Sequence, residues 1–321
     1  MTLTEAERST TVGAYWAVAA VFAFSLNDVL IKSLAADYPL YQLMFIRSAV
    51  GVLFILGVIL PMNGPLSLLK TQRLGLHFVR GACVVFASFC FFLGLASLPL
   101  ADAVAIFFVS PLLIAILSVA LLGETVGPRR WAAIFVGLLG VIIVLRPGTN
   151  AFQIASLLPL AAAFFYAILH ILTRRIGGTE NATAMVFYIQ VTFFLVSCVA
   201  GLALGHGRFD VYDHASLRFL FAAWTWPPMG DFLLMCGLGI FSSMGGFLIS
   251  QAYRRSEAAL VAPFEYTMMP LAVFWGLTIF DEWPDSIAWA GIALIMASGL
   301  ALIWREAAAR RRSNLFAPKR L

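Results

Sequence analysis

The chain has 321 residues, of which 62% are hydrophobic and only 12% are charged, and its formal net charge is +5. Soluble domains usually contain about 25% charged residues, so this composition excludes a soluble globular protein and indicates a polytopic membrane protein. The excess of Lys and Arg is expected to set membrane topology and to attract anionic lipids rather than nucleic acid.

About 20 apolar residues are needed for a helix to cross a hydrocarbon core of about 30 Å. Divided at its Pro, Gly and charge clusters, the sequence predicts ten such helices. In chain order they cover residues 12–35, 39–60, 76–97, 100–122, 129–146, 152–175, 182–204, 231–252, 257–280 and 285–304. The first helix has no signal-cleavage pattern and is predicted to remain uncleaved. Most connections are very short, and the longer ones are 61–75 and 205–230.

The distribution of basic residues predicts the orientation of these helices. With the N-terminus in the cytoplasm, the outer side holds only Lys32, Arg146, Arg208 and Arg218, and the cytoplasmic loops and C-terminal tail hold most of the remaining Lys and Arg. Because positive charge is retained on the cytoplasmic side, both termini are predicted to be cytoplasmic.

The sequence also contains an internal repeat. "AVFAFSLNDVLIKS" (20–33) aligns with "AAFFYAILHILTRR" (162–175), and "LLGETVGPRRWAA" (121–133) aligns with "IFDEWPDSIAWAG" (279–291). These matches predict a five-helix repeat over 1–150, a second over 151–305, and a basic cytoplasmic tail over 306–321. Because five is odd, the second copy enters the membrane inverted, as in many secondary transporters whose substrate site lies at mid-membrane between the repeats.

Three segments make the chain resemble the ten-helix, EamA-type branch of the drug/metabolite transporter superfamily. They are "LMFIRSAVG" around Arg47, "PLADAVAIFFVSPLLIAILSVALLGETVGPRRWAAIFVGLLGVIIVLRPG" at 99–148 and "ALVAPFEYTMMPLAVFWGLTIFDEWPDSIAWAG" at 259–291. The second copy has "DE" at 281–282 where the first has "GE". The resemblance implies an all-α carrier of a small organic metabolite. "APFEYT" is similar to members that carry vitamins or S-adenosylmethionine; amino-acid-related substrates stay open.

Five ionisable residues fall inside the predicted helices: Asp28, Arg47, Arg80, His170 and Glu265. Each costs about 2.5–3.5 kcal/mol at a helix centre, so such groups normally face a cavity or a partner. Glu265 lies between Pro263 and Pro270, which are expected to bend the helix and free carbonyl groups. Glu265 is therefore predicted to face a wet interior at mid-depth, as a substrate ligand or proton carrier, with a structural hydrogen bond as the alternative.

Asn27 and Asp28 on the first helix match the position of His170 on the sixth. Asp28, His170 and Glu265 are proton-coupling candidates, because histidine titrates near neutral pH and a carboxylate can take up a proton. The alternative for Asp28 and His170 is hydrogen bonding between helices or an ion pair with Arg47, which could instead hold a carboxylate of the substrate. Arg80 is predicted to extend to the cytoplasmic interface.

Aromatic side chains are abundant, and most are expected to pack or to face lipid. A few together with Glu265 would suit a cationic or flat heteroaromatic molecule. The predicted substrate-binding set is Glu265, Tyr266, Asn27, Asp28, Arg47, Phe24, Phe107, Tyr166, His170, Phe241 and Met269. Gly137 and Gly291 lie on thin faces of the fifth and tenth helices, which predicts close helix contact within a protomer or across a dimer.

The main prediction is a secondary carrier in a bacterial inner membrane that works by alternating access. An integral-membrane scaffold and a lipid-modifying enzyme are the alternatives, although no HExxH, GxSxG or GxxxxGK[ST] motif is present. The four cysteines lie in apolar runs, so neither a disulfide nor a metal site is expected, and no cofactor is expected. The expected partners are an organic substrate, membrane lipids and, as a candidate coupling ion, the proton. Transport direction and the choice between monomer and homodimer stay open.

Overall fold

The computed structural model describes residues 5–71, 73–123, 127–147, 149, 153–176, 182–255 and 264–315. Regular secondary structure in this part of the chain is helical throughout. The helices are α1 (Glu5–Leu34), α2 (Leu40–Phe54), η1 (Ile55–Ile59), α3 (Leu60–Asn63), η2 (Leu66–Leu69), α4 (Leu74–Leu95), α5 (Leu100–Phe107), α6 (Ser110–Leu122), α7 (Pro128–Leu145), η3 (Ile154–Ser156), α8 (Leu157–Ile176), α9 (Ala182–Leu204), α10 (Ala215–Phe221), α11 (Met229–Arg255), α13 (Met268–Phe280) and α14 (Ser286–Leu315).

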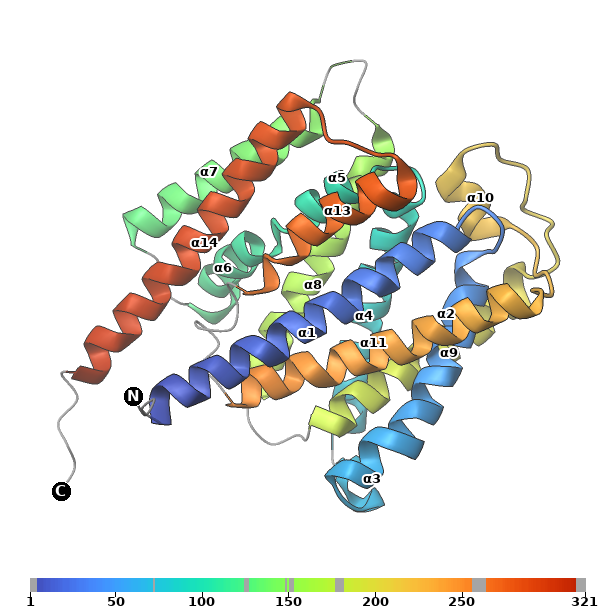
Figure 1. Cartoon of the computed structure of the whole chain (residues 1–321), viewed down its shortest axis with the longest axis horizontal. Helices are drawn as coiled ribbons and strands as arrows, with labels where there is room; N and C mark the ends of the chain where they lie inside the picture. The colour runs from blue at the N-terminus through green and yellow to red at the C-terminus, as the bar shows by residue number, and fades with distance from the viewer. Residues whose placement is uncertain are drawn as a thin grey trace.

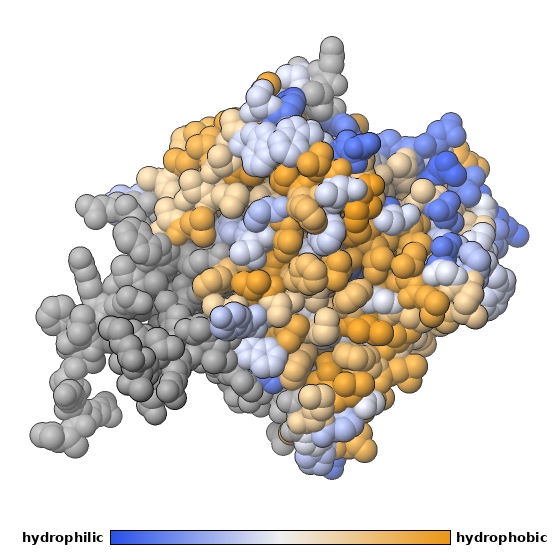
Figure 2. Space-filling model, viewed as in Figure 1, coloured by the Kyte–Doolittle hydropathy of each residue, from blue (hydrophilic) through white to orange (hydrophobic). Residues whose placement is uncertain are grey.

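Seven helical segments in this part of the chain are long and apolar enough to cross a membrane: Gly13–Leu34, Leu40–Met62, Leu74–Leu95, Leu100–Leu121, Ile154–Leu172, Thr183–Leu204 and Met229–Ala252. Three shorter apolar helices, Trp131–Leu145, Met268–Phe280 and Ser286–Ala301, lie where the remaining spans are expected. Hydrophobic residues cover much of the visible face, and hydrophilic residues gather toward the end that carries α10 (Figure 2). This surface suits a multi-pass protein surrounded by lipid.

The helices pack in a regular set of pairs (Figure 1). α1 lies along α11, and α4 lies along α8. α2 contacts α9 and α11, α9 also contacts α4, and α5 contacts α13. The first residues of α1 and the last residues of α14 lie toward the same end of the bundle.

α7 and α14 pack through glycine. A Cβ atom added to Gly140 would lie 2.9 Å from the carbonyl oxygen of Gly291, and one added to Gly291 would lie 2.8 Å from the carbonyl oxygen of Gly140. Because glycine has no side chain, the two helices can approach each other this closely at Gly140 and Gly291. The thin faces expected from the sequence therefore meet within one chain.

Two helices that the sequence predicts as continuous are interrupted. Within predicted span 100–122, Phe108 and Val109 form a turn between α5 and α6. Within predicted span 257–280, the residues around Tyr266 form a turn, and α13 starts only at Met268. Glu265 thus lies before this turn and outside α13.

The expectation that Pro270 frees a carbonyl group was wrong, whereas the expected departure from a straight helix is seen as the turn before α13. Pro270 lies in the first turn of α13, where a backbone N–H has no intrahelical partner in any case. The carbonyl oxygen of Tyr266, which an N–H at Pro270 would reach, accepts a hydrogen bond from the Met269 N–H at 3.1 Å. Pro270 therefore fits its helix without freeing that carbonyl. Pro263 lies outside the described residues.

The boundaries differ at two further places. α14 continues to Leu315, past the predicted end at 304 and into the predicted tail. The segment "REAAARRR" is rich in strong helix formers, so the helix outlasts its apolar part. The connection 205–230 contains the short helix α10.

Candidate substrate site

A first polar cluster joins α1 and α2. Asn27, Asp28 and Arg47 are 2%, 7% and 8% exposed. Asn27 Nδ2 donates a hydrogen bond to Asp28 Oδ1 at 3.2 Å, and Asp28 and Arg47 interact electrostatically. Asn27 Oδ1 and Arg47 Nε have no hydrogen-bond partner within the described part of the chain. This cluster therefore holds an unused acceptor and an unused donor. A buried polar atom without a partner is costly, so both atoms are available to a ligand.

Aromatic rings on two other helices surround Arg47. Its guanidinium carbon lies 5.0 Å from the ring centre of Phe193 on α9 and 5.8 Å from that of Phe92 on α4. Nη1 also donates to Met44 Sδ at 3.2 Å. A cation held over ring faces is stabilised by their quadrupoles. The charge of Arg47 is therefore balanced by Asp28 and by rings.

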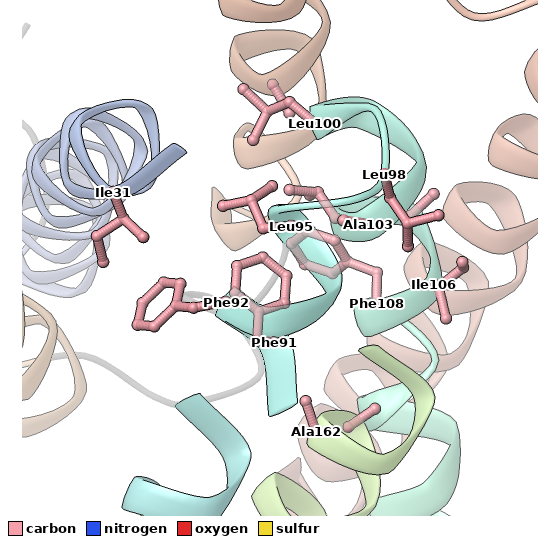
Figure 3. Packing of buried hydrophobic residues seen from close by; sticks show 14 of the residues in the cluster. Ile31, Phe91, Phe92, Leu95, Leu98, Leu100, Ala103, Ile106, Phe108 and Ala162 are labelled. Atoms are coloured by element: carbon pink, nitrogen blue, oxygen red, sulfur yellow. The ribbon is translucent and has the colours of Figure 1, made fainter. Parts of the chain in front are cut away.

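A row of rings leads away from the first cluster. Ring centres are 5.6 Å apart for Phe92 and Phe91, 5.2 Å for Phe91 and Phe107, and 5.2 Å for Phe107 and Tyr166. Tyr166 then meets His170 edge to face at 4.6 Å. Figure 3 shows Phe92 reaching from α4 toward α1, where Ile31 lies. We call Phe92, Phe91, Phe107 and Tyr166 the ring row.

A second polar cluster lies at the far end of the ring row. Tyr166 and His170 come from α8, and Glu265 interacts electrostatically with Tyr166 and Tyr266. Arg80 on α4 interacts electrostatically with His170. Arg80 is only 6% exposed, so the prediction that it extends to the interface was wrong. Arg80 instead lies in the interior, within electrostatic range of the imidazole of His170.

The two helix interruptions meet each other. Phe108 and Tyr266 each lie in a turn before a helix, and their rings stack at 4.9 Å with an interplanar angle of 28°. Tyr266 is 3% exposed, and its hydroxyl has no hydrogen-bond partner among the described residues. That hydroxyl lies against Gly299 of α14, where a Cβ atom would not fit.

The remaining predicted residues are placed differently. Met269 is buried in the first turn of α13. Phe24 packs on Gly245 of α11, where an added Cβ atom would lie 2.8 Å from the ring. The ring of Phe241 lies near Gly237, one turn back on its own helix. Phe24 and Phe241 thus pack beside α11 and are not members of the ring row. Asp28 belongs to the first cluster and His170 to the second.

Sequence reasoning missed several residues of this interior. Phe91, Phe92 and Phe193 contact the predicted residues, but nothing in the sequence separates them from lipid-facing phenylalanines. Gln190 of α9 is 3% exposed and donates to Ser243 Oγ at 2.9 Å and to Ser242 Oγ at 3.2 Å. A search for uncharged polar residues inside spans would have found it. Among the described residues, no group of three or more His, Cys, Asp or Glu could hold a metal ion.

Comparison with known proteins agrees with a transporter. Residues 11–146 match the EamA-like transporter family. The chain is 28% identical to a riboflavin transporter of Vibrio cholerae serotype O1, covering 94% of this chain and 97% of the relative. It is 26% identical to an S-adenosylmethionine uptake transporter of Rickettsia bellii, covering 95% and 97%. It is 27% identical to the pseudopaline exporter CntI of Pseudomonas aeruginosa, covering 90% and 95%.

A solved crystal structure has the same fold, with a TM-score of 0.62 over 93% of this chain and 98% of that chain at 20% identity. Apolar helices, a buried polar interior and transporter relatives together define a multi-pass membrane transporter of small molecules. The EamA-like match over residues 11–146 and the bacterial transporters similar to nearly the whole chain support an EamA-type transporter of the drug/metabolite transporter superfamily, in a bacterial inner membrane. This confirms the family resemblance.

Proposed function

We propose that the protein is a secondary transporter that moves a small organic metabolite by alternating access, with the substrate held along the ring row between the two polar clusters. The ring row carries this proposal, since it connects buried polar groups on α1, α2 and α8 through α4 and α5. Buried polar groups inside membrane spans normally serve a pathway or a ligand.

The helix contacts support the proposed inverted repeat. If α1, α2, α4, α5 and α7 correspond to α8, α9, α11, α13 and α14, the α1–α11 contact corresponds to α8–α4, and α2–α11 to α9–α4. The α2–α9, α5–α13 and α7–α14 contacts each correspond to themselves. A pseudo-two-fold axis requires this pattern, and paired repeats of this kind build many secondary transporters.

Phe108 and Tyr266 support the same symmetry. Glu124 and Glu282, aligned from sequence, are separated by 282 − 124 = 158 positions, and Phe108 and Tyr266 by 266 − 108 = 158 positions. Counterpart residues can touch only near the symmetry axis, and these two rings stack. The site we propose therefore lies beside the axis.

The unused polar atoms favour a particular substrate chemistry. Asn27 Oδ1 can accept and Arg47 Nε can donate, next to the faces of Phe92 and Phe193. A flat molecule with a donor beside an acceptor would satisfy both atoms while it stacks on the rings. The relatives named for riboflavin and S-adenosylmethionine make a vitamin or a nucleoside-like metabolite the first candidates for this chain.

Glu265 is our candidate for a second role, as substrate ligand or as proton carrier together with Asp28 and His170. A Glu265→Gln variant in proteoliposomes separates the two roles. Loss of concentrative transport with intact exchange of preloaded substrate assigns proton coupling. Loss of both activities assigns substrate binding, and full activity removes Glu265 from the mechanism.

Thermal stabilisation of the purified protein by a metabolite library that includes riboflavin and S-adenosylmethionine tests the site. We expect a compound that raises the unfolding temperature of the wild type but not of Arg47→Gln. The matched control is Arg208→Gln, because Arg208 is exposed in the outer connection and its loss should leave the shift intact. Equal stabilisation of wild type and Arg47→Gln would move the site elsewhere. Failure of every stabilising compound to cross the proteoliposome membrane would favour the scaffold or lipid-modifying enzyme.

A further inference from the structure

We call the end of the bundle that carries α10 the outer end. There, an ion pair between Lys32 and Glu282 connects the first half of the chain with the second. Lys32 Nζ on α1 lies 2.8 Å from Glu282 Oε1 and 2.9 Å from Glu282 Oε2, in the connection between α13 and α14. Lys32 Nζ also donates to the carbonyl oxygen of Leu98 at 2.6 Å. The Lys32 side chain is only 11% exposed and that of Glu282 is 27% exposed, so solvent screens the pair incompletely.

Glu282 holds a third element at the same point. Its Oε2 atom accepts a hydrogen bond from the backbone N–H of Leu100, the first residue of α5, at 2.9 Å. A carboxylate at a helix N-terminus interacts favourably with the helix dipole. The ring of Phe280 lies 5.1 Å from Lys32 Nζ. One carboxylate therefore joins α1, the start of α5 and the α13–α14 connection.

The ion pair closes the seam between α1 and α13. Below it, Trp275 Nε1 of α13 donates to Ser25 Oγ of α1 at 3.2 Å, and Ser25 is 1% exposed. Ser25 precedes Lys32 by seven residues, which is about 10 Å along a helix. The contact between α1 and α13 is much smaller than that between α1 and α11, so this seam can open with less loss of packing.

Two other polar contacts at the outer end join elements that are already packed together. Arg146 and Asp285 pair between α7 and α14, which are held by close glycine contacts. Tyr38 donates to Asp231 Oδ2 at 2.5 Å, at the start of α11, along which α1 packs. The Lys32–Glu282 pair differs from these two contacts because it crosses a lightly packed seam.

We propose that Lys32 and Glu282 are the outer gate of the transporter, closed in this structure and broken when the substrate site opens to the outside. The proposal rests on alternating access as the proposed function. Loss of either charge leaves the other partly buried without its ion-pair partner, which is unfavourable. The closed state is thereby destabilised relative to the outward-open state, whereas exchange of the two charges keeps the attraction. Lys32 also interacts electrostatically with Asp102, which none of the variants changes.

Thiol labelling below the gate tests this. The reporter is Ser25→Cys in a background in which the free cysteines Cys83, Cys90, Cys198 and Cys236 are replaced by alanine. A membrane-impermeant sulfonated maleimide is applied to spheroplasts and, separately, to inverted membrane vesicles. The variants are Lys32→Glu, Glu282→Lys, the double exchange, and Glu282→Gln, whose amide oxygen can still accept from Leu100. Arg146→Glu is the matched control at the same end.

We expect the single charge variants to label about tenfold faster than the parent in spheroplasts, as a shifted two-state equilibrium predicts. Glu282→Gln should show a smaller rise, and Arg146→Glu should label like the parent. The double exchange should restore part of the protection, since it keeps the ion pair but loses the hydrogen bonds to Leu98 and Leu100. If the ion pair only stabilises the fold and has no gating role, its loss would loosen the whole protein, and labelling would become faster in both preparations. Three outcomes would overturn the proposal: faster labelling in both preparations, faster labelling in inverted vesicles only, and no faster labelling in any variant.

Labelling measures the accessibility of the cysteine and not the flux of substrate. The gate and the proposed function can therefore be contradicted separately. Labelling as expected in a protein that moves no solute would support the gate and contradict the proposed function. If transport is normal but the single charge variants stay protected, the gate is wrong and the proposed function stands. Variants that do not reach the membrane are replaced by the Lys32→Met, Glu282→Gln pair, which removes both charges and is expected to label faster than the parent.

Discussion

Removal of the buried hydroxyl of Tyr266 is expected to affect substrate binding and protein stability differently. Because this hydroxyl has no hydrogen-bond partner in the described part of the chain, Tyr266→Phe removes an unsatisfied polar group. We expect the free energy of unfolding to change by less than about 1 kcal/mol or to rise, and stabilisation by a bound substrate to weaken.

Chemical unfolding in detergent, with and without a compound found in the library screen, measures both effects. Phe108→Tyr is the matched control, because it adds a hydroxyl to the ring stacked on Tyr266 and should lower stability in the absence of substrate. A Tyr266→Phe protein that binds like the wild type would remove the hydroxyl from the site.

At the scale of helix pairs, Gly291 sets the distance between α7 and α14. Gly291→Ala would bring a Cβ atom within 2.8 Å of the Gly140 carbonyl oxygen and 3.2 Å of the Val144 nitrogen. Backbone atoms cannot move aside like a flexible side chain, so we expect a loss of about 1–3 kcal/mol, the usual cost of overpacking. Gly57→Ala, with no heavy atom within 4 Å of the added Cβ atom, is the control and should keep the wild-type unfolding temperature.

The start of α14 has a pH-dependent cap. Asp285 Oδ1 accepts from the Ala288 N–H at 2.8 Å and pairs with Arg146. The hydrogen bond from Arg146 lowers the pKa of Asp285 below its ordinary value of 3.8. A carboxyl whose folded pKa is lowered stabilises the fold above its unfolded pKa, and this contribution is lost as pH falls through the folded value.

We therefore expect the unfolding temperature of the wild type to fall more steeply below pH 3.8 than that of Asp285→Asn. Asparagine keeps a capping oxygen but does not titrate. Unfolding followed by tryptophan fluorescence across this acidic range measures the difference, and identical pH profiles would show that Asp285 does not contribute.

At this scale the sequence predicts the helices well and their interruptions poorly. Hydropathy and Pro, Gly and charge clusters predicted helices in all the observed long apolar segments, because each must bury its backbone polar groups within itself. The turn at Phe108 was missed, since the residues around it stay apolar and only Pro111 marks it. Near Tyr266, Pro263 and Pro270 predicted a bend but not a break between two helices. For the site, ionisable residues such as Asp28 and Arg47 could be predicted because charge is rare inside a membrane. The role of the phenylalanines around them could not be predicted, since it depends on which helices pack against each other.

For the whole molecule, the distribution of basic residues predicts that both termini lie in the cytoplasm. The starting end of α1 and the final end of α14 lie toward the same end of the bundle, as an even number of spans requires. A cysteine added after Leu321, in the background without native cysteines, should react with the impermeant maleimide only in inverted vesicles. A cysteine at exposed Tyr212 in the outer connection should react only in spheroplasts, and the reverse pattern would invert the topology.

The stacked rings of Phe108 and Tyr266 bear on the energetics of the cycle. If the two repeats were identical, the inward-open and outward-open states would be related by the symmetry axis and would have equal free energies. Each sequence difference between counterpart positions removes part of that degeneracy. In the inverted repeat that we propose, Phe108 and Tyr266 are counterparts next to the axis and differ by one hydroxyl, so we expect this atom to bias the resting distribution between the two states without changing the charge of the site. Divergence between the proposed repeats would thus set how much of the protein rests in each state, whereas the gradients of substrate and coupling ion set the direction of net transport.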